Sequence, residues 1–239
     1  GDLHLGNIVL IQGEPVPFDG IEFSPELRWV DVLSELAFLG MDLEVRGLYR
    51  QASVVLNRYL ALSGAYDGLD VFDFYRIYRA MVRAKITQLS RNPAVETAAM
   101  RDQALTRYRA YVEYALRLAE PRSPRLFLTH GFSGSGKSRL ASRLAEETGA
   151  IVIRSDVERK RLYADLQESH PKPGLYEPVF TERTYQAMRH QTQAMLKAGH
   201  SVVVDATFLQ REHRGMFQQL ARQLGIEWYL FSCKAPLQT

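Results

Sequence analysis

The stretch Gly131 to Ser138 reads GFSGSGKS and satisfies the pattern G-x-x-x-x-G-K-[ST]. A short apolar run, Leu126 to Thr129, precedes it, and a helical pattern from Ser138 to Glu147 follows it. Glycines allow the backbone to turn so tightly that successive N–H groups point inward at phosphate oxygens. The start of the following helix adds the positive end of its dipole. The sequence therefore predicts a phosphate-binding loop, and the alternative is a glycine-rich turn with a chance lysine.

Within this loop two side chains carry chemistry. Lys137 is expected to bridge the β- and γ-phosphates of ATP and so to act in catalysis, and the Ser138 hydroxyl is expected to ligate Mg²⁺. Arg139 begins a basic rim, for which a solvated helix face is the alternative. The predicted nucleotide-binding residues are Gly131, Ser133, Gly134, Ser135, Gly136, Lys137, Ser138 and Arg139.

Two carboxylates are expected at the same edge of a sheet. Asp205 ends the apolar run VVVD, and Asp156 comes shortly after another apolar strand. Ligands bind at the carboxyl ends of parallel strands in open α/β folds. We interpret Asp205 as a ligand of Mg²⁺ or its water, and Asp156 as the base for an acceptor hydroxyl. Arg159 or Lys160 is a candidate to hold an anionic substrate. For both aspartates the alternative role is a helix N-cap.

The hydrophobic pattern divides the chain into two domains, 1–119 and 120–239, joined by a Pro-rich, charged connector over 120–125. A hairpin over 8–18 opens the first domain, and helical periodicity dominates from residue 30 to 119. In the second domain strands alternate with helices, which predicts an α/β fold with three αβα layers and a mainly parallel sheet. Its strands are expected at 126–129, 150–153, 201–204 and 226–231, and its helices at 138–147, 178–198 and 212–224.

Composition narrows the class of protein. The chain has 239 residues, of which 46% are hydrophobic and 24% charged, so wholesale disorder is excluded. Its apolar runs are shorter than the roughly 18 residues that span a bilayer, so no membrane partner is expected. A single cysteine, Cys233, excludes a disulfide framework and favours a reducing, cytoplasmic setting. Residues 1–121 carry 13 Lys and Arg against 16 Asp and Glu, whereas 122–239 carry 17 against 11, which favours an anionic ligand for the second half.

The start of the chain holds a second group of candidate catalytic and metal-binding residues. It reads GDLHLGN, in which Asp2 and Asn7 have the spacing of the catalytic Asp and the Mg²⁺-binding Asn of kinase catalytic loops. The hairpin then returns Asp19 beside this loop, where its carboxylate would complete a Mg²⁺ site with Asn7. A loop of turn-forming residues without catalysis is the alternative.

These motifs resemble two families. Residues 125–239 are similar to P-loop kinases of the polynucleotide-kinase, gluconate-kinase and zeta-toxin group, on the strength of GFSGSGKS, RSDVERKRL over 154–162 and VVVDATF over 202–208. The resemblance implies that Asp156 approaches the acceptor hydroxyl. Residues 1–119 resemble the C-terminal lobe of aminoglycoside phosphotransferases and choline kinases, on GDLHLGN, Asp19 and the segment 31–37, where an Asp of the family braces the loop. It implies catalysis by Asp2 and Mg²⁺ binding by Asn7 and Asp19.

The sequence thus predicts Mg²⁺-dependent phosphoryl transfer from ATP to a hydroxyl of a small molecule or a nucleic-acid end, within a bifunctional protein. We expect its start, including a nucleotide-clamping N-terminal lobe, to lie before Gly1, and an arginine-bearing lid and a last strand to follow Thr239. An ATP-sensing or ATP-hydrolysing module without a dedicated acceptor is the alternative. Nucleic acid is a candidate partner that is not favoured, and the acceptor and the oligomeric state are left open.

Overall fold

The computed structural model describes residues 1–166 and 174–234 and divides the chain into two compact units. The first unit comprises Gly1–Leu56 and Val71–Pro121, and the second comprises Asn57–Asp70 and Arg122–Thr239. The division falls within one helix, so residues 57–70 pack with the second unit although the sequence pattern groups them with the first. The predicted domains, 1–119 and 120–239, remain a prediction about how the chain is organised.

A hairpin opens the first unit. A short 3₁₀ turn, η1 (Leu5–Asn7), leads into strand β1 (Ile8–Ile11), which pairs antiparallel with β2 (Glu14–Pro17). Positive φ angles of 54° at Gln12 and 86° at Gly13 form the tight two-residue turn that matches the twist of paired strands. The hairpin has the place that the sequence predicts, and a single helical turn, α1 (Pro25–Arg28), follows it.

Four longer helices follow the hairpin and α1. They are α2 (Val32–Val45), α3 (Tyr49–Ser63), α4 (Phe72–Leu89) and α5 (Ala98–Ala119). Asp31 accepts a hydrogen bond from the Leu33 N–H and so caps α2, and Thr97 caps α5 in the same way. Helices α2, α4 and α5 bury a cluster made of Phe38, Met41, Ala80, Ala84, Tyr111, Tyr114 and Ala115. The three aromatic members of this cluster are core residues, whereas Phe74 and Tyr78 of α4 are exposed.

A buried polar network joins the same three helices. Arg76 of α4 is 8% exposed and donates to the Tyr114 hydroxyl over 2.8 Å, and that hydroxyl donates to Glu44 of α2 over 2.9 Å. Arg76 also pairs with Glu44 and with Asp73. Burial, and then the Glu44 charge, raise the pKa of Tyr114. The network satisfies groups that would be costly to bury alone.

The second unit is built on a parallel sheet. Its strands are β3 (Leu126–His130), β4 (Ile151–Arg154), β5 (Val202–Asp205) and β6 (Trp228–Ser232), in the order β4-β5-β3-β6. The helices between them are α6 (Lys137–Thr148), α7 (Ser155–Ala164), α8 (Pro178–Lys197) and α9 (Arg211–Leu224), and the 3₁₀ turn η2 (Tyr66–Asp70) belongs to the same unit. A mixed α/β unit with a parallel four-stranded sheet is consistent with a P-loop NTPase fold, as predicted.

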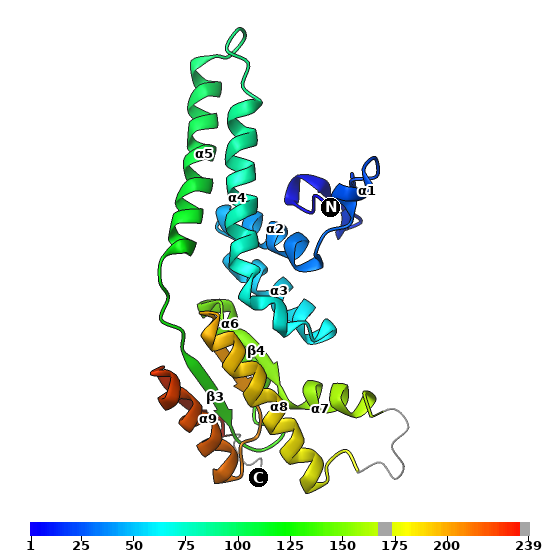
Figure 1. Ribbon diagram of the computed structural model, residues 1–239, viewed down its shortest axis with the longest axis vertical. Helices are drawn as coiled ribbons and strands as arrows, with labels where there is room; N and C mark the ends of the chain where they lie inside the picture. The colour runs from blue at the N-terminus through cyan, green and yellow to red at the C-terminus, as the bar shows by residue number, and fades with distance from the viewer. Residues whose placement is uncertain (167–173, 235–239) are drawn as a thin grey trace. The chain divides into compact units, whose positions relative to one another are not determined.

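Helices cover both faces of this sheet (Figure 1). Because side chains alternate along a strand, Phe127, Val152 and Val203 share one face, where they pack against α6. Leu128 and its neighbours on the other face are fully buried, and α8 packs against β5. The continuous apolar runs of the sequence are those of strands buried on both sides. Among the described residues, no helix combines the length and the apolar composition that crossing a bilayer requires.

We predict that Leu128→Ala destabilises the second unit by about 2 to 5 kcal/mol, because it opens a cavity at a fully buried position of an inner strand. The two tryptophans are Trp29 and Trp228. Urea unfolding followed by Trp228 fluorescence in a Trp29→Phe background reports on the second unit. The matched control, Val179→Ala, truncates a residue that is 77% exposed and should change stability by less than about 0.5 kcal/mol. Equal effects of the two variants would contradict the assigned core.

Candidate functional site

Three glycines of the predicted loop have left-handed backbone angles. The φ angles are 140° at Gly131, 79° at Gly134 and 86° at Gly136. Gly136 is the N-cap of α6, and it offers no side chain to the first amides of that helix. Since the first N–H groups of a helix have no partner inside it, those at the start of α6 remain available to an anion. The loop therefore has the backbone geometry of a phosphate cradle.

Lys137 lies over this loop. Its side chain is largely buried, and its Nζ donates to the Phe132 carbonyl over 2.6 Å and to the Ser135 hydroxyl over 3.5 Å. These contacts hold the ammonium group among the loop amides, where the oxygens of a phosphate would replace the carbonyl as its partner. Ser135 thus supports the loop from within.

One cavity of about 460 Å³ brings the predicted catalytic groups together. Lys137, Ser138 and Arg139 enter it from the loop and α6, Asp156 from α7, and Asp205 from the end of β5. The cavity is lined by Ser133, Gly134, Gly136, Lys137, Ser138, Arg139, Ser155, Asp156, Asp205, Ala206 and Thr207. Gly131 and Ser135 belong to the predicted set but lie outside this lining.

Asp205 is buried at the base of the site. It is 5% exposed, accepts from the Thr129 hydroxyl over 3.3 Å, and lies 3.9 Å from the Arg154 Nε. Helix α9 begins at Arg211 with Gln210 as its N-cap, so the alternative role of Asp205 as a helix cap is wrong. Thr129 and Arg154 hold this carboxylate in place, and sequence patterns alone did not reveal either of them.

Asp156 is exposed in the first turn of α7. This helix follows β4 directly, with Arg154 as its N-cap residue, and no side chain caps it. The Asp156 carboxylate therefore faces the cavity without being used to start the helix. Its role as a base for an acceptor hydroxyl stays a prediction.

The basic residues of α7 differ in their surroundings. Arg159 is 8% exposed and donates to the Leu175 carbonyl over 3.0 Å and to the Thr181 hydroxyl over 2.9 Å. It is thus engaged in fastening the chain that leads into α8, whereas Lys160 is exposed. Of the two cations considered for an anionic substrate, Lys160 is the one that the fold leaves accessible.

The donor atoms of the cavity fit a magnesium ion that arrives with a nucleotide. Ser138 and Asp205 offer a hydroxyl and a carboxylate, the hard oxygen ligands that Mg²⁺ prefers. Within residues 1–166 and 174–234, no group of three or more His, Cys, Asp or Glu side chains is placed to hold a metal. Mg²⁺ commonly uses one or two carboxylates and completes its shell with phosphates and water, so this donor set suits it.

The residues predicted at the chain start also meet. The Asn7 Nδ2 donates to the Asp2 carboxylate over 3.1 Å, to the Asp2 carbonyl over 3.1 Å and to the Asp19 carbonyl over 3.4 Å. Asp2 and Asp19 adopt positive φ angles of 76° and 55°, which are uncommon for residues with a side chain. The first unit therefore gathers Asp2, Asn7 and Asp19 around one point.

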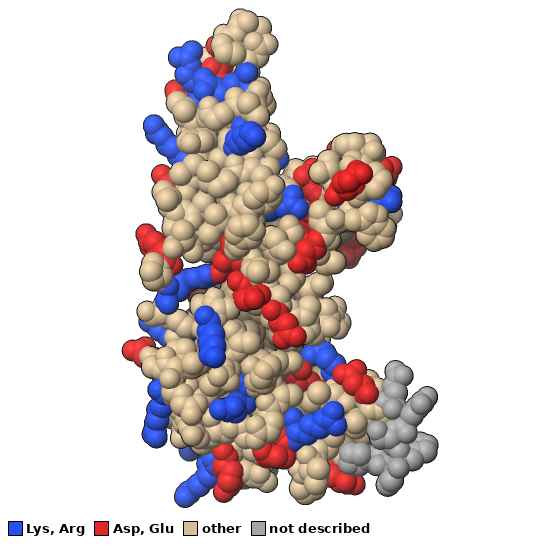
Figure 2. All heavy atoms as spheres, viewed as in Figure 1, with Lys and Arg blue, Asp and Glu red and all other residues tan. Residues whose placement is uncertain are grey.

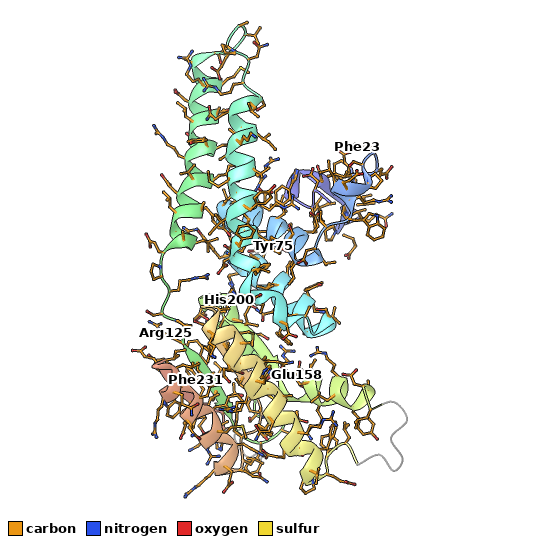
Figure 3. The ribbon with its side chains drawn as sticks, in the orientation of Figure 1. Phe23, Tyr75, Arg125, Glu158, His200 and Phe231 are labelled. Carbon is orange, nitrogen blue, oxygen red and sulfur yellow. The ribbon has the colours of Figure 1, made fainter. Side chains whose placement is uncertain are left out.

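Two carboxylates of α2 brace this loop. Glu35 accepts from the Leu3 N–H and Asp42 from the Leu5 N–H, each over 2.9 Å. Asp31, in the segment that resembles the bracing region of the family, instead caps α2 and accepts from the Tyr75 hydroxyl over 2.9 Å (Figure 3). Asp42, together with Glu35, thus braces the loop at the chain start, whereas Asp31 caps α2.

Figure 2 shows the distribution of basic side chains on one face of the second unit. On the face that Figure 2 shows around α8 and α9, Lys and Arg are separated by other surface and form no continuous stripe. A nucleic-acid backbone is usually bound by clustered positive charge. Nucleic acid stays a candidate partner that the sequence does not favour.

Comparison with known proteins identifies the class of the second unit. Residues 126–239 match the family model described as an AAA domain, which confirms the P-loop part of the predicted resemblance. An uncharacterized protein of Mycobacterium tuberculosis strain H37Rv is 33% identical over 241 residues, which cover 99% of this chain and 47% of the relative. An uncharacterized protein of Mycobacterium bovis matches equally. The chain thus spans about half the length, 47%, of these curated relatives.

Solved kinases are similar over about half of the chain. The APS kinase CysC of Mycobacterium tuberculosis, in complex with AMPPNP and APS, is 29% identical with a TM-score of 0.40, and the match covers 50% of this chain and 66% of that chain. A putative kinase from Chloroflexus aurantiacus is 17% identical with a TM-score of 0.41, covering 48% of this chain and 61% of that chain.

We predict that Gly131→Ala disturbs the loop more than Gly134→Ala. A Cβ at position 131 would lie 2.4 Å from the Cys233 carbonyl oxygen, whereas one at position 134 meets no atom within 4 Å. Both replacements suffer the strain of a positive φ, about 1 to 2 kcal/mol, but only the first also collides with backbone. Thermal unfolding of the two variants should show the lower midpoint for Gly131→Ala. Equal midpoints would show that the Cys233 contact does not constrain the loop.

Proposed function

We propose that the second unit is a phosphotransferase that moves the γ-phosphoryl group of ATP to a hydroxyl of its substrate, with Mg²⁺ as cofactor. The observation that carries this proposal is the single cavity shared by Lys137, Asp156 and Asp205. A phosphate cradle, a base and a buried metal-type carboxylate at one sheet edge are the parts that phosphoryl transfer requires. The AAA domain match over residues 126–239 supports the nucleotide-binding part.

Each residue has a defined task in this proposal. The loop amides and Lys137 hold the β- and γ-phosphates, and Ser138 and Asp205 hold Mg²⁺, which neutralises charge on the phosphates. Asp156 accepts the proton of the acceptor hydroxyl as its oxygen bonds to the γ-phosphorus. The bond from that phosphorus to the oxygen bridging to the β-phosphate breaks, and ADP departs.

The acceptor is a hydroxyl compound of unidentified structure, and the exposed Lys160 favours an anionic one. A reducing cytoplasm that contains ATP is the compartment that suits this chemistry. If no acceptor exists, the same site would make the unit an ATP-binding or ATP-hydrolysing sensor, which is the competing function.

We expect Lys137→Ala to lower ATP turnover by at least about 10²-fold, because it removes a charged donor from the phosphates in a site with few others. Turnover is measured with radiolabelled ATP. The matched control is Arg143→Ala, on the same helix, which removes only an exposed pair with Glu147. Unchanged turnover in Lys137→Ala would overturn the assignment of the loop.

A screen of hydroxyl compounds with γ-labelled ATP separates the kinase from the sensor. Label should appear in a product with the wild-type protein and be lost with Asp156→Asn. Binding of ATP with slow hydrolysis and no labelled product would instead favour the sensor.

We further propose that the first unit is the C-terminal lobe of an aminoglycoside-phosphotransferase-like kinase, which would make the protein bifunctional. The support is the meeting of Asp2, Asn7 and Asp19 in a loop braced by Glu35 and Asp42. In this proposal Asp2 is the base, and Asn7 and Asp19 bind Mg²⁺.

The complete natural protein tests this second activity. With Lys137→Ala silencing the P-loop site, residual transfer to hydroxyl acceptors should fall about 10²-fold or more on adding Asp2→Asn. Asp102→Asn, an exposed carboxylate on α5, is the control. If no transfer remains in Lys137→Ala alone, or if Asp2→Asn leaves it unchanged, the first unit is not a catalyst of this kind.

A further inference from the structure

Residues 57–70 form an integral part of the P-loop unit. They comprise the end of α3 and the turn η2, and they bury Leu60, Tyr66 and Leu69, which are 0%, 3% and 1% exposed. The nucleotide cavity is lined by other residues, so this segment does not contact it. Its polar contacts reach the region of β4, which precedes Asp156, and α7, which contains Asp156, and the Leu69 carbonyl also lies 2.9 Å from the His200 Nε2.

Asn57 binds the edge strand β4. Its Nδ2 donates to the Ala150 carbonyl over 3.1 Å, and its Oδ1 accepts from the Val152 N–H over 2.7 Å. An edge strand leaves one row of backbone groups without a neighbouring strand. The Asn57 amide supplies both missing partners, as an adjacent strand would, and so fixes β4 four residues before Asp156.

Arg161 binds the end of α3. Its Nη2 donates to the Ala61 carbonyl over 2.9 Å, one of the last four carbonyls that a helix cannot pair internally. A cation is also favoured there by the helix dipole. The guanidinium lies 5.8 Å from the centre of the Tyr66 ring. Arg161 thus fixes α7 to the segment five residues after Asp156.

Gly64 allows this contact. Its φ angle is 74°, and a Cβ there would lie 2.7 Å from the Arg161 Nε and 2.8 Å from its Cζ. A side chain at this position would push the guanidinium away from α3. The turn after α3 therefore fits Arg161 only when residue 64 is glycine.

Glu158 of α7 is buried and joins Arg161 to α8. It is 1% exposed, pairs with Arg161 and accepts from Gln191 of α8 over 3.1 Å (Figure 3). Burial, and then the Glu158 charge, raise the pKa of Tyr66 to about 12, so its ring stays neutral beside this ion pair. The buried carboxylate has a cation and an amide donor as partners, which is the condition for a stable buried charge.

From these contacts we infer that Asn57 and Arg161 are positioning residues for Asp156. The carboxylate is exposed and its own side chain makes no anchoring contact among the described residues, so its place in the cavity is set by the backbone on either side. Asn57 holds that backbone on one side and Arg161 on the other. The inference rests on the proposed function, in which Asp156 acts on the acceptor or on the water that replaces it.

The first test is ATP hydrolysis by Arg161→Ala. The expected result is a kcat lower by about 10- to 10²-fold, since a misplaced group loses much of its effect. The KM for ATP should stay within about twofold, because the phosphate loop between β3 and α6 makes no contact with Arg161. Arg222→Ala, an exposed arginine on α9, is the control and should behave as wild type. Because unfolded molecules would lower the apparent kcat without changing the KM, kcat is expressed per ATP-binding site, counted by titration with the nucleotide.

The second test repeats Arg161→Ala in an Asp156→Asn background. If Arg161 acts through Asp156, the second substitution should lower kcat no further. Asn57→Ala, which removes the two bonds to the Ala150 carbonyl and the Val152 N–H, should give the same pattern and serves if Arg161→Ala fails to fold. Independent, multiplying losses, or a wild-type kcat in both Arg161→Ala and Asn57→Ala, would overturn the positioning role alone. Wild-type turnover in Asp156→Asn itself would overturn the role of Asp156 in the proposed function as well.

Discussion

The left-handed backbone of Gly136 is the constraint on which the site depends. It lets the chain reverse immediately before α6 and leaves the first amides of that helix without a side-chain cap. Lys137 and Ser138 are the first two residues of the same helix, so the direction of the turn also aims the ammonium group and the hydroxyl into the cavity. The loop is fixed from behind, because Gly131 packs against the Cys233 carbonyl and the Cys233 N–H donates to His130 at the end of β3 over 2.7 Å. The sheet thereby sets the shape of the phosphate cradle.

Local patterns predicted the four strands of the second unit and its helices α6, α8 and α9, but not α7, because the causes of those elements are local. Short apolar runs that follow a glycine or a proline define the strands to within one or two residues, and the loop motif carries its own geometry. Because the carboxyl ends of parallel strands meet at one edge of the sheet, the sequence predicted that Asp156 and Asp205 lie there, and both line one cavity. The partners of Asp205 were beyond prediction, because they follow from the strand order β4-β5-β3-β6. Only when β5 lies between β3 and β4 do Thr129 and Arg154 both reach Asp205, and no residue spacing encodes that order.

Helix α2 of the first unit shows the same limit of prediction from sequence. Glu35 and Asp42 are seven residues apart on α2, so they share one face, two turns from each other. The periodicity reveals that they share a face but cannot say which neighbour that face meets. This face of α2 contacts the backbone amides of Leu3 and Leu5, whereas the Asp31 carboxylate caps the N-terminus of the helix. Likewise, nothing in the helical pattern of α3 shows that its last turns belong to the P-loop unit.

Burial decides how much of the positive charge of residues 122–239 can attract an anionic ligand. Arg159 is a sequence candidate for an anionic substrate and Arg161 lies two residues further on, yet both donate to backbone carbonyls within the unit. The formal side-chain charges that line the cavity balance, since Lys137 and Arg139 oppose Asp156 and Asp205. A triphosphate would therefore be attracted by the loop amides and by a cation that comes with it, more than by an excess of basic side chains. Backbone amides and a metal ion bind phosphate whatever molecule carries it. In the proposed reaction the loop would therefore bind the triphosphate of the nucleotide. In the proposed reaction, selection of the acceptor would come from residues on the α7 side, where Asp156 and Lys160 are exposed.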